Sequence, residues 1–100
     1  MFVILVEYTR PMEEVEVYTP AHRAHLATGY DAGWLLCSGR TDPLTGGVIL
    51  AVGDRADIDR FVANDPFLVE GVAAYTIVEF NPNRAAEDVS ELLAARGVTI

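Results

Sequence analysis

The sequence contains no lysine. All seven of its cationic side chains are arginines, set against 15 aspartates and glutamates, and the formal net charge at pH 7 is −8. Binding to nucleic acid depends on clustered lysine or arginine side chains that contact phosphates, and no such cluster is present. The same negative charge disfavours binding to anionic membrane surfaces. We therefore expect neither nucleic acid nor a membrane as a partner.

Cysteine is also scarce. Cys37 is the only one, so no disulfide can form within the chain, which is typical of a reducing compartment. No apolar run approaches the roughly 20 residues of a membrane span. The first ten residues lack the charged segment and the cleavage site of a signal peptide. We expect a cytoplasmic protein, in which Cys37 lies inside an apolar strand as a buried, inert thiol.

The chain does have enough apolar residues, 51% of its 100, for a hydrophobic core. This length is typical of one domain, which we divide into a core at residues 1–82 and a C-terminal helical extension at residues 83–100. A domain of this size buries only roughly two-thirds of its unfolded surface, so association with another chain would help to stabilise it.

Stretches rich in β-branched and aromatic residues alternate with helical patterns. The order is βαββαβ followed by a C-terminal helix, which predicts an α+β, ferredoxin-like fold with a four-stranded antiparallel sheet and two helices on one face. The expected strands are Phe2–Tyr8, Trp34–Gly39, Val48–Val52 and Val72–Phe80. The expected helices are Met12–Gly33, a helix capped by Asp54 with Ile58, Phe61 and Val62 as its apolar face, and Ala85–Arg96.

The strands carry apolar side chains on both sides. In the first strand, Ile4 and Val6 point to one side, while Val3 and Leu5 point to the other. An antiparallel sheet with one solvent-exposed face would alternate apolar with polar residues, and two helices can cover only one face. We expect the second face to pack against a second copy in a symmetric homodimer, to enclose a ligand cavity, or both.

His22 is the first candidate for chemistry, because it lies on the apolar stripe of the first helix with Tyr18 and Leu26 and so points toward the sheet. Thr19-Pro20 is typical of an N-cap and a first helical residue, which offers Pro20 as an alternative helix start. In the first turn of such a helix, the dipole and burial would both disfavour the imidazolium. A neutral imidazole can act as a general base. The alternative is a core histidine bonded to a backbone carbonyl.

His25 shares the helix with His22 but lies off the apolar stripe, so we expect it to face solvent. Two histidines at this spacing are a weak signal for a metal. A structural zinc site needs about four ligands, and the chain has one cysteine and no further histidine. We expect no metal ion and no organic cofactor.

Four further residues are candidates for the site. Asp65, in N-D-P-F, is typical of a helix N-cap, and a carboxylate beside an imidazole would also fix its tautomer. Ser38 offers a hydroxyl group and Arg40 a guanidinium that can bind a carboxylate substrate. Tyr8 is a third candidate contact for a substrate. The alternatives are a serine at a strand end, a solvated turn arginine and a core or interface tyrosine.

Over residues 1–82 the chain resembles the YciI-like family. The matching stretches are V-E-Y ending at Tyr8, E-E-V ending at Val15, P-A-H-x-x-x-L from Pro20, A-G ending at Gly33, S-G from Ser38, T-G-G-V-I-L-A from Thr45, N-D-P-F from Asn64 and Y-x-I-V-E-F from Tyr75. The resemblance implies a dimeric α/β barrel in which two sheets pack face to face. It also implies that the family's proposed His–Asp pair corresponds to His22 and Asp65.

One position departs from the family. Many relatives have an arginine before P-A-H, where this chain has Thr19. If that arginine binds an anionic group, this chain has lost the contact or uses Arg40 or Arg23 instead. Proteins resembling the family include a chloromuconolactone dehalogenase, and muconolactone isomerases share the dimeric architecture. These precedents, which rest on analogy of fold, suggest proton removal next to a carbonyl.

The resulting hypothesis is an isomerase or lyase that needs no cofactor. His22 is its general acid/base, Asp65 orients His22, and Ser38, Arg40 and Tyr8 contact a small carboxylate or lactone. A non-catalytic ligand-binding or accessory dimer is the alternative, and a subunit of a larger enzyme is a third. The contacts of His22 discriminate between them, because a ring bonded only to backbone, with no cavity beside it, would favour a structural or binding role.

Overall fold

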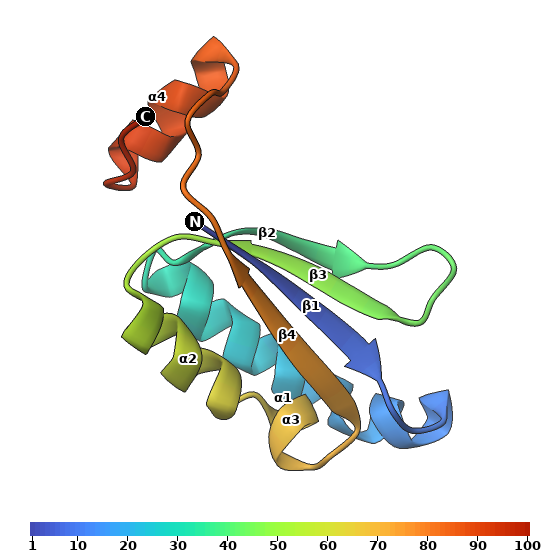
Figure 1. Cartoon of the computed structure of the whole chain (residues 1–100). Coiled ribbons are helices and arrows are strands. Elements are labelled where there is room, and N and C mark those ends of the chain that lie inside the picture. The colour runs from blue at the N-terminus through green and yellow to red at the C-terminus, as the bar shows by residue number, and fades with distance from the viewer.

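Four antiparallel strands form one sheet in the order β2-β3-β1-β4, and α1, α2 and α3 lie on one of its faces (Figure 1). The computed structural model describes all 100 residues. The predicted α+β, ferredoxin-like fold is confirmed. No helix is long and apolar enough to cross a membrane. The elements are β1 (Phe2–Tyr8), α1 (Met12–Asp31), β2 (Leu35–Arg40), β3 (Gly46–Ala51), α2 (Arg55–Ala63), α3 (Pro66–Val69), β4 (Ala73–Glu79) and α4 (Glu87–Ala95).

The strand register decides which side chains meet the helices. Ile4 in the central strand β1 lies opposite Ile49 of β3 and Ile77 of β4, and all three point to the helical face. Paired residues share a face because side chains alternate along each strand. The helices add their own apolar faces to this layer. The resulting core consists of Phe2, Ile4, Val6, Val15, Leu35, Ile49, Ala51, Ile58, Phe61, Val62, Phe67, Val72 and Ala73.

The other side of the sheet, called the open face below, carries no helix (Figure 1). Its larger apolar residues are Val3, Leu5, Val48, Leu50 and Val78, and the register also places Glu7, Cys37, Gly39, Ala74 and Thr76 on this side. Leu5 and Val78 are 43% and 46% exposed, although both would be core residues in a covered sheet. The prediction that both faces of the sheet are apolar is therefore confirmed.

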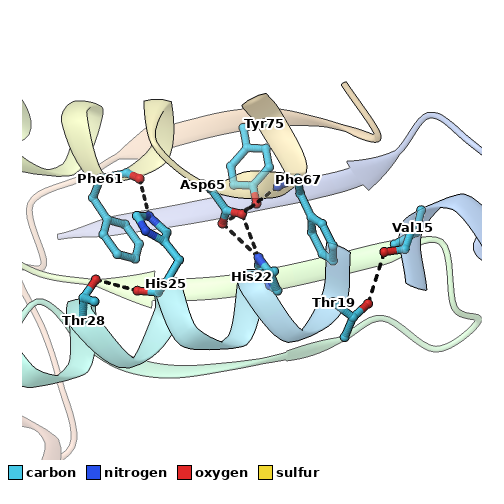
Figure 2. Close-up of polar contacts among 9 residues, drawn as sticks. All are labelled: Val15, Thr19, His22, His25, Thr28, Phe61, Asp65, Phe67 and Tyr75. Atoms are coloured by element: carbon cyan, nitrogen blue, oxygen red, sulfur yellow. Dashed lines mark hydrogen bonds and ion pairs between the residues drawn. The ribbon is translucent and has the colours of Figure 1, made fainter. Parts of the chain in front are cut away.

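The first helix begins at Met12, as predicted, and excludes the alternative start at Pro20. It begins after Pro11 and continues unbroken through Pro20, so Pro20 does not start it, and the Thr19 hydroxyl bonds back to the Val15 carbonyl at 3.3 Å instead of capping (Figure 2). A proline inside a helix costs about 3 kcal/mol or more. Packing on both sides of it offsets this cost, because Val15 and Gly29 are both buried.

Gly29 allows α1 to lie close to its neighbours. A Cβ atom at this position would come within 2.8 Å of the Phe61 ring and 2.9 Å of the Leu35 side chain. Any larger residue would push α1 away from β2 and α2. The spacing between α1 and the sheet, on which the cavity beside His22 depends, therefore requires glycine here.

Three smaller predictions are also corrected. Asp54 stands at the N-cap position of α2, but its side chain makes no capping bond. The second and third strands are displaced from the expected ranges, because Gly46 and Gly47 pair with β1 instead of forming only a turn. Cys37 is exposed, since it lies opposite Leu50 at the open face, where no segment of the chain covers it.

The C-terminal helix α4 stands apart from the body at the end of an extended segment (Figure 1). It is shorter than expected, running from Glu87 to Ala95. A hydrogen bond from the Arg96 guanidinium to the Gly33 carbonyl, at 3.0 Å, links the end of this helix to the body.

Candidate functional site

His22 and Asp65 are brought together across 43 positions of sequence. Nδ1 of His22, on α1, lies 2.8 Å from Oδ1 and 3.0 Å from Oδ2 of Asp65, at the junction of α2 and α3 (Figure 2). The imidazole stacks on the Phe67 ring at a centroid distance of 3.9 Å and an interplanar angle of 9°. The carboxylate and the Phe67 ring together hold the position and the orientation of the imidazole.

Asp65 serves three donors at once. As predicted, it is the N-cap of α3, where Oδ1 accepts from the backbone N–H of Phe67 at 3.0 Å. The Tyr75 hydroxyl on β4 donates to Oδ2 at 2.6 Å. The third partner is His22. The Asp65 side chain is 1% exposed and that of His22 is 14% exposed, so the carboxylate is buried behind the imidazole.

The surroundings set the charges of this cluster. Burial on its own would raise the pKa of Asp65, but the hydrogen bonds from His22, Tyr75 and the Phe67 backbone together hold it below its usual value. Burial, followed by the bond to Asp65, raises the pKa of Tyr75 far above its usual value. Asp65 is therefore an ionised acceptor, and Tyr75 keeps its proton and donates.

These charges fix the tautomer of His22. An ionised carboxylate can only accept, so Nδ1 of His22 must carry the hydrogen that bonds to it. In the neutral ring, Nε2 then holds a lone pair. Nε2 makes no hydrogen bond within the chain. Because every buried polar side-chain atom has a partner, Nε2 is not among the buried atoms. Nε2 is therefore the atom that His22 can offer to a ligand.

A cavity of about 370 Å³ adjoins His22, between α1 and the β2–β3 edge of the sheet. Of the five predicted site residues, four line it and the fifth, Asp65, lies behind His22. The size is at the small end of ligand sites, so it suits a molecule of about one ring. The lining residues are Val6, Tyr8, Thr19, His22, Arg23, Leu26, Ser38, Gly39, Arg40, Gly47, Val48, Ile49 and Phe67.

Ser38 and Arg40 reach this cavity because of the strand register. They lie opposite Ile49 and Gly47 of β3, and so point to the helical side of β2. The Ser38 hydroxyl is 2.7 Å from the Tyr30 hydroxyl on α1. Tyr8 meets the Phe67 ring edge to face at 5.9 Å.

Two expectations about the histidines are wrong. His22 lies in the middle of α1, so the field of a helix start does not act on it. His25 does not simply face solvent: its Nε2 is 2.7 Å from the Phe61 carbonyl, and its ring stacks on Phe61 at 4.3 Å (Figure 2). His25 thus has the backbone-bonded role that was the alternative for His22.

Sequence reasoning missed Tyr75 and Tyr30. Tyr75 lies in an apolar strand, where a core role is the ordinary interpretation, and nothing in the spacing shows that its hydroxyl meets Asp65. Tyr30 and Ser38 are only eight residues apart across the α1–β2 turn, and the turn at Gly33 is the one signal that could have paired them. No group of three or more His, Cys, Asp or Glu side chains lies close enough to hold a metal ion.

The architecture and the site define a class: a ferredoxin-like α+β domain in which a buried carboxylate orients a histidine at the edge of a small cavity. Within this class, the chain belongs to the YCII-related domain family, whose model matches residues 1–81. No curated protein matches it significantly in sequence.

A solved structure shares the fold. It is 5-chloro-2-hydroxyhydroquinone dehydrochlorinase (TftG) from Burkholderia phenoliruptrix AC1100, in complex with 2,5-dihydroxybenzoquinone. It is 23% identical to this chain with a TM-score of 0.57, and the alignment covers 80% of this chain and 93% of that one. At this identity the likeness supports the fold alone.

Proposed function

We propose that the protein is a small-molecule enzyme that moves protons with His22 as general acid/base and Asp65 as the residue that positions it. The observation that carries the proposal is that the two ring nitrogens of His22 differ in their contacts. Nδ1 bonds to a buried carboxylate, whereas Nε2 has no partner within the chain and His22 lines the cavity. A histidine bonded only to backbone would have pointed to a structural role. His25, on the same helix, has that arrangement and provides a built-in comparison.

The reaction begins with removal of a proton from a carbon next to a carbonyl group. Nε2 accepts the proton, and the electron pair of the C–H bond moves onto the carbonyl as an enolate. The Asp65 carboxylate stabilises the imidazolium that forms. In isomerisation, the imidazolium then returns the proton to another atom of the substrate. In elimination, the enolate electron pair forms a C=C bond, the leaving group departs with the electron pair of its own bond to carbon, and the imidazolium gives its proton to solvent. TftG is by its name a dehydrochlorinase, and loss of HCl is an elimination of this type.

The proposed substrate is a small carboxylate or lactone. Tyr8 and the Phe67 ring provide flat apolar walls, Ser38 provides a hydroxyl that Tyr30 already orients, and Arg40 provides a positive charge. The cytoplasmic location and the division into a core at 1–82 and an extension at 83–100 remain predictions from the sequence.

Proton exchange with solvent tests the activity whatever the product is. Muconolactone, chlorinated muconolactones and their open-chain acids are incubated in D₂O with the protein and followed by NMR. We expect deuterium to enter the position next to the carbonyl of at least one compound, or chloride to be released from it. If no compound exchanges faster with protein than without, the catalytic proposal fails, and the non-catalytic ligand-binding module becomes the better account of the cavity.

We also propose that the open face pairs with a second copy. Leu5, Val78 and the neighbouring apolar side chains form an exposed apolar patch, which is typical of a surface that another molecule covers. A symmetric contact buries the same patch on both copies.

Light scattering is expected to give twice the mass of the chain at micromolar concentration. Leu5→Glu is expected to shift the protein toward monomer, because it places a charge at the centre of the patch. Val17→Glu is the matched control, since Val17 is 68% exposed on α1. A monomeric wild type, or equal masses for all three proteins, would contradict this arrangement.

A further inference from the structure

The arginines of this chain divide into those with a partner and those without. Arg10, Arg55 and Arg60 form ion pairs with nearby carboxylates, with Glu14, with Asp59 and Glu79, and with Asp57 respectively. Arg96 donates to a backbone carbonyl. The guanidinium groups of Arg23, Arg40 and Arg84 form no ion pair or hydrogen bond within the chain, and two of these three, Arg23 and Arg40, line the cavity beside His22.

The same cavity has no acidic lining residue, although 15 of the 22 charged residues of the chain are aspartate or glutamate. The Asp65 carboxylate is buried behind His22 and already accepts hydrogen bonds from three donors. Two arginines without a partner therefore line a small space that has no acidic lining residue, in a chain with a net charge of −8. Such a space attracts an anion.

The two arginines come from different elements. Arg23 follows His22 on α1, whereas Arg40 ends β2 opposite Gly47. The apolar residues that line the same cavity include Val6, Leu26 and Phe67. This arrangement fits a ligand that has one anionic group for each guanidinium and a short apolar body between the two groups.

We propose that the cavity binds a dianion, most simply a dicarboxylate built on a body of about one ring, with one anionic group at Arg23 and the other at Arg40. This inference rests on the proposed function in that it names the substrate class of the same site, but the binding itself requires no turnover. It makes Arg23 a second specificity-determining residue beside Arg40. The two arginines also give the chain a way to bind an anion although Thr19 stands where many relatives have an arginine.

The test compares matched pairs of ligands by isothermal titration calorimetry. The probes are the three benzenedicarboxylates, which place their carboxylates at three separations, and the monoamide of each, which has nearly the same shape and one charge fewer. We expect at least one dicarboxylate to bind about 10-fold or more tightly than its monoamide, because a hydrogen bond to a charged group is worth about a factor of ten or more. The difference is expected to shrink as salt is raised.

Two variants locate the contacts. Arg23→Gln and Arg40→Gln are each expected to reduce the preference for the dicarboxylate to about twofold or less, since either change leaves only one guanidinium. Arg84→Gln is the matched control, because Arg84 also lacks a partner but lies outside the cavity. Both tested side chains are in exposed residues, so their thermal unfolding midpoints are expected to match that of the wild type.

Equal affinity for all three dicarboxylates and their monoamides, or an unchanged preference in both cavity variants, would overturn the dianion proposal even if His22-dependent proton exchange were found. Conversely, a dicarboxylate preference that survives in His22→Gln, in a protein that exchanges no proton in any tested compound, would support the dianion site and reject the proposed catalysis. The two proposals can therefore fail separately.

Discussion

The His22→Gln variant is expected to exchange substrate protons about 10²–10⁴-fold more slowly than the wild type, which is the usual contribution of a positioned general base. Glutamine keeps a polar side chain on α1 that can still bond to Asp65. It provides no basic nitrogen at the cavity, however, so the proton has no acceptor. The measurement is the initial rate of deuterium incorporation, at saturating substrate, into the compound that the wild type exchanges fastest.

His25→Gln is the matched control for this variant. His25 lies one turn further along the same helix and also stacks on a phenylalanine, but its Nε2 meets a backbone carbonyl and does not face the cavity. We expect His25→Gln to lose about 1 kcal/mol of stability through the altered hydrogen bond and to retain the wild-type exchange rate. Equal rates for the wild type and His22→Gln, or equal losses in the two variants, would contradict the assignment of His22.

Asp65→Asn is expected to slow exchange by a similar factor, about 10²–10⁴-fold, through the tautomer of His22. The asparagine amide can present its NH₂ group to Nδ1, which would then carry the lone pair, and the ring hydrogen would move to Nε2. The imidazole would stay in place but could no longer accept a proton at the cavity. A purely structural role for Asp65 would instead leave the rate per folded molecule unchanged, so the rate is corrected for the folded fraction.

The same variant changes how stability depends on pH. The pKa of Asp65 is lowered by folding, so its carboxylate stabilises the native state above its unfolded pKa of about 4, and this contribution is lost as the pH falls through the lower folded value. We expect the wild type to lose urea resistance as the pH falls from about 5 to 2, and Asp65→Asn to show a flatter profile in that range. At pH 7 the variant is expected to be about 1–3 kcal/mol less stable, because buried donors lose a charged acceptor.

Asp59→Asn provides the control for these unfolding experiments. Asp59 pairs with Arg55 on the exposed side of α2, and such pairs contribute only about 0–1 kcal/mol. We expect its acid profile to follow that of the wild type closely. Identical profiles for the wild type and Asp65→Asn would show that the hydrogen bonds to Asp65 do not hold its carboxylate in the ionised form.

Much of the fold follows from local patterns in the sequence. The β-branched and aromatic residues of Phe2–Tyr8 predict β1 with its observed bounds, and the apolar residues on both sides of the strands predict the open face. The sequence predicts the observed start of α1 at Met12, but it also offers Pro20 as an alternative start. Thr19-Pro20 has the chemistry of a helix start, and only the burial of Val15 and Gly29 on either side shows that packing overrides it.

The site is predictable in part. The apolar stripe places His22 toward the sheet, and the family resemblance pairs it with Asp65. Its remaining features depend on long-range geometry that no spacing reveals: the Tyr75 hydroxyl reaches Asp65 from β4, and the Phe67 ring stacks on His22. The contrast between His22 and His25 also depends on long-range geometry. Nδ1 of His22 bonds to a carboxylate and Nε2 of His25 bonds to a backbone carbonyl, and the positions of both partners are set by how α2 and α3 pack on α1.

The most direct test of the central claim is the ¹⁵N NMR spectrum of histidine-labelled protein, with and without a benzenedicarboxylate. The chain has only two histidines, so the His25→Gln variant assigns the signals. We predict that His22 carries its hydrogen on Nδ1 and that only its Nε2 signal moves as ligand is added. A hydrogen on Nε2 of neutral His22, or ligand-induced shifts at His25 with none at His22, would contradict the proposed role of His22.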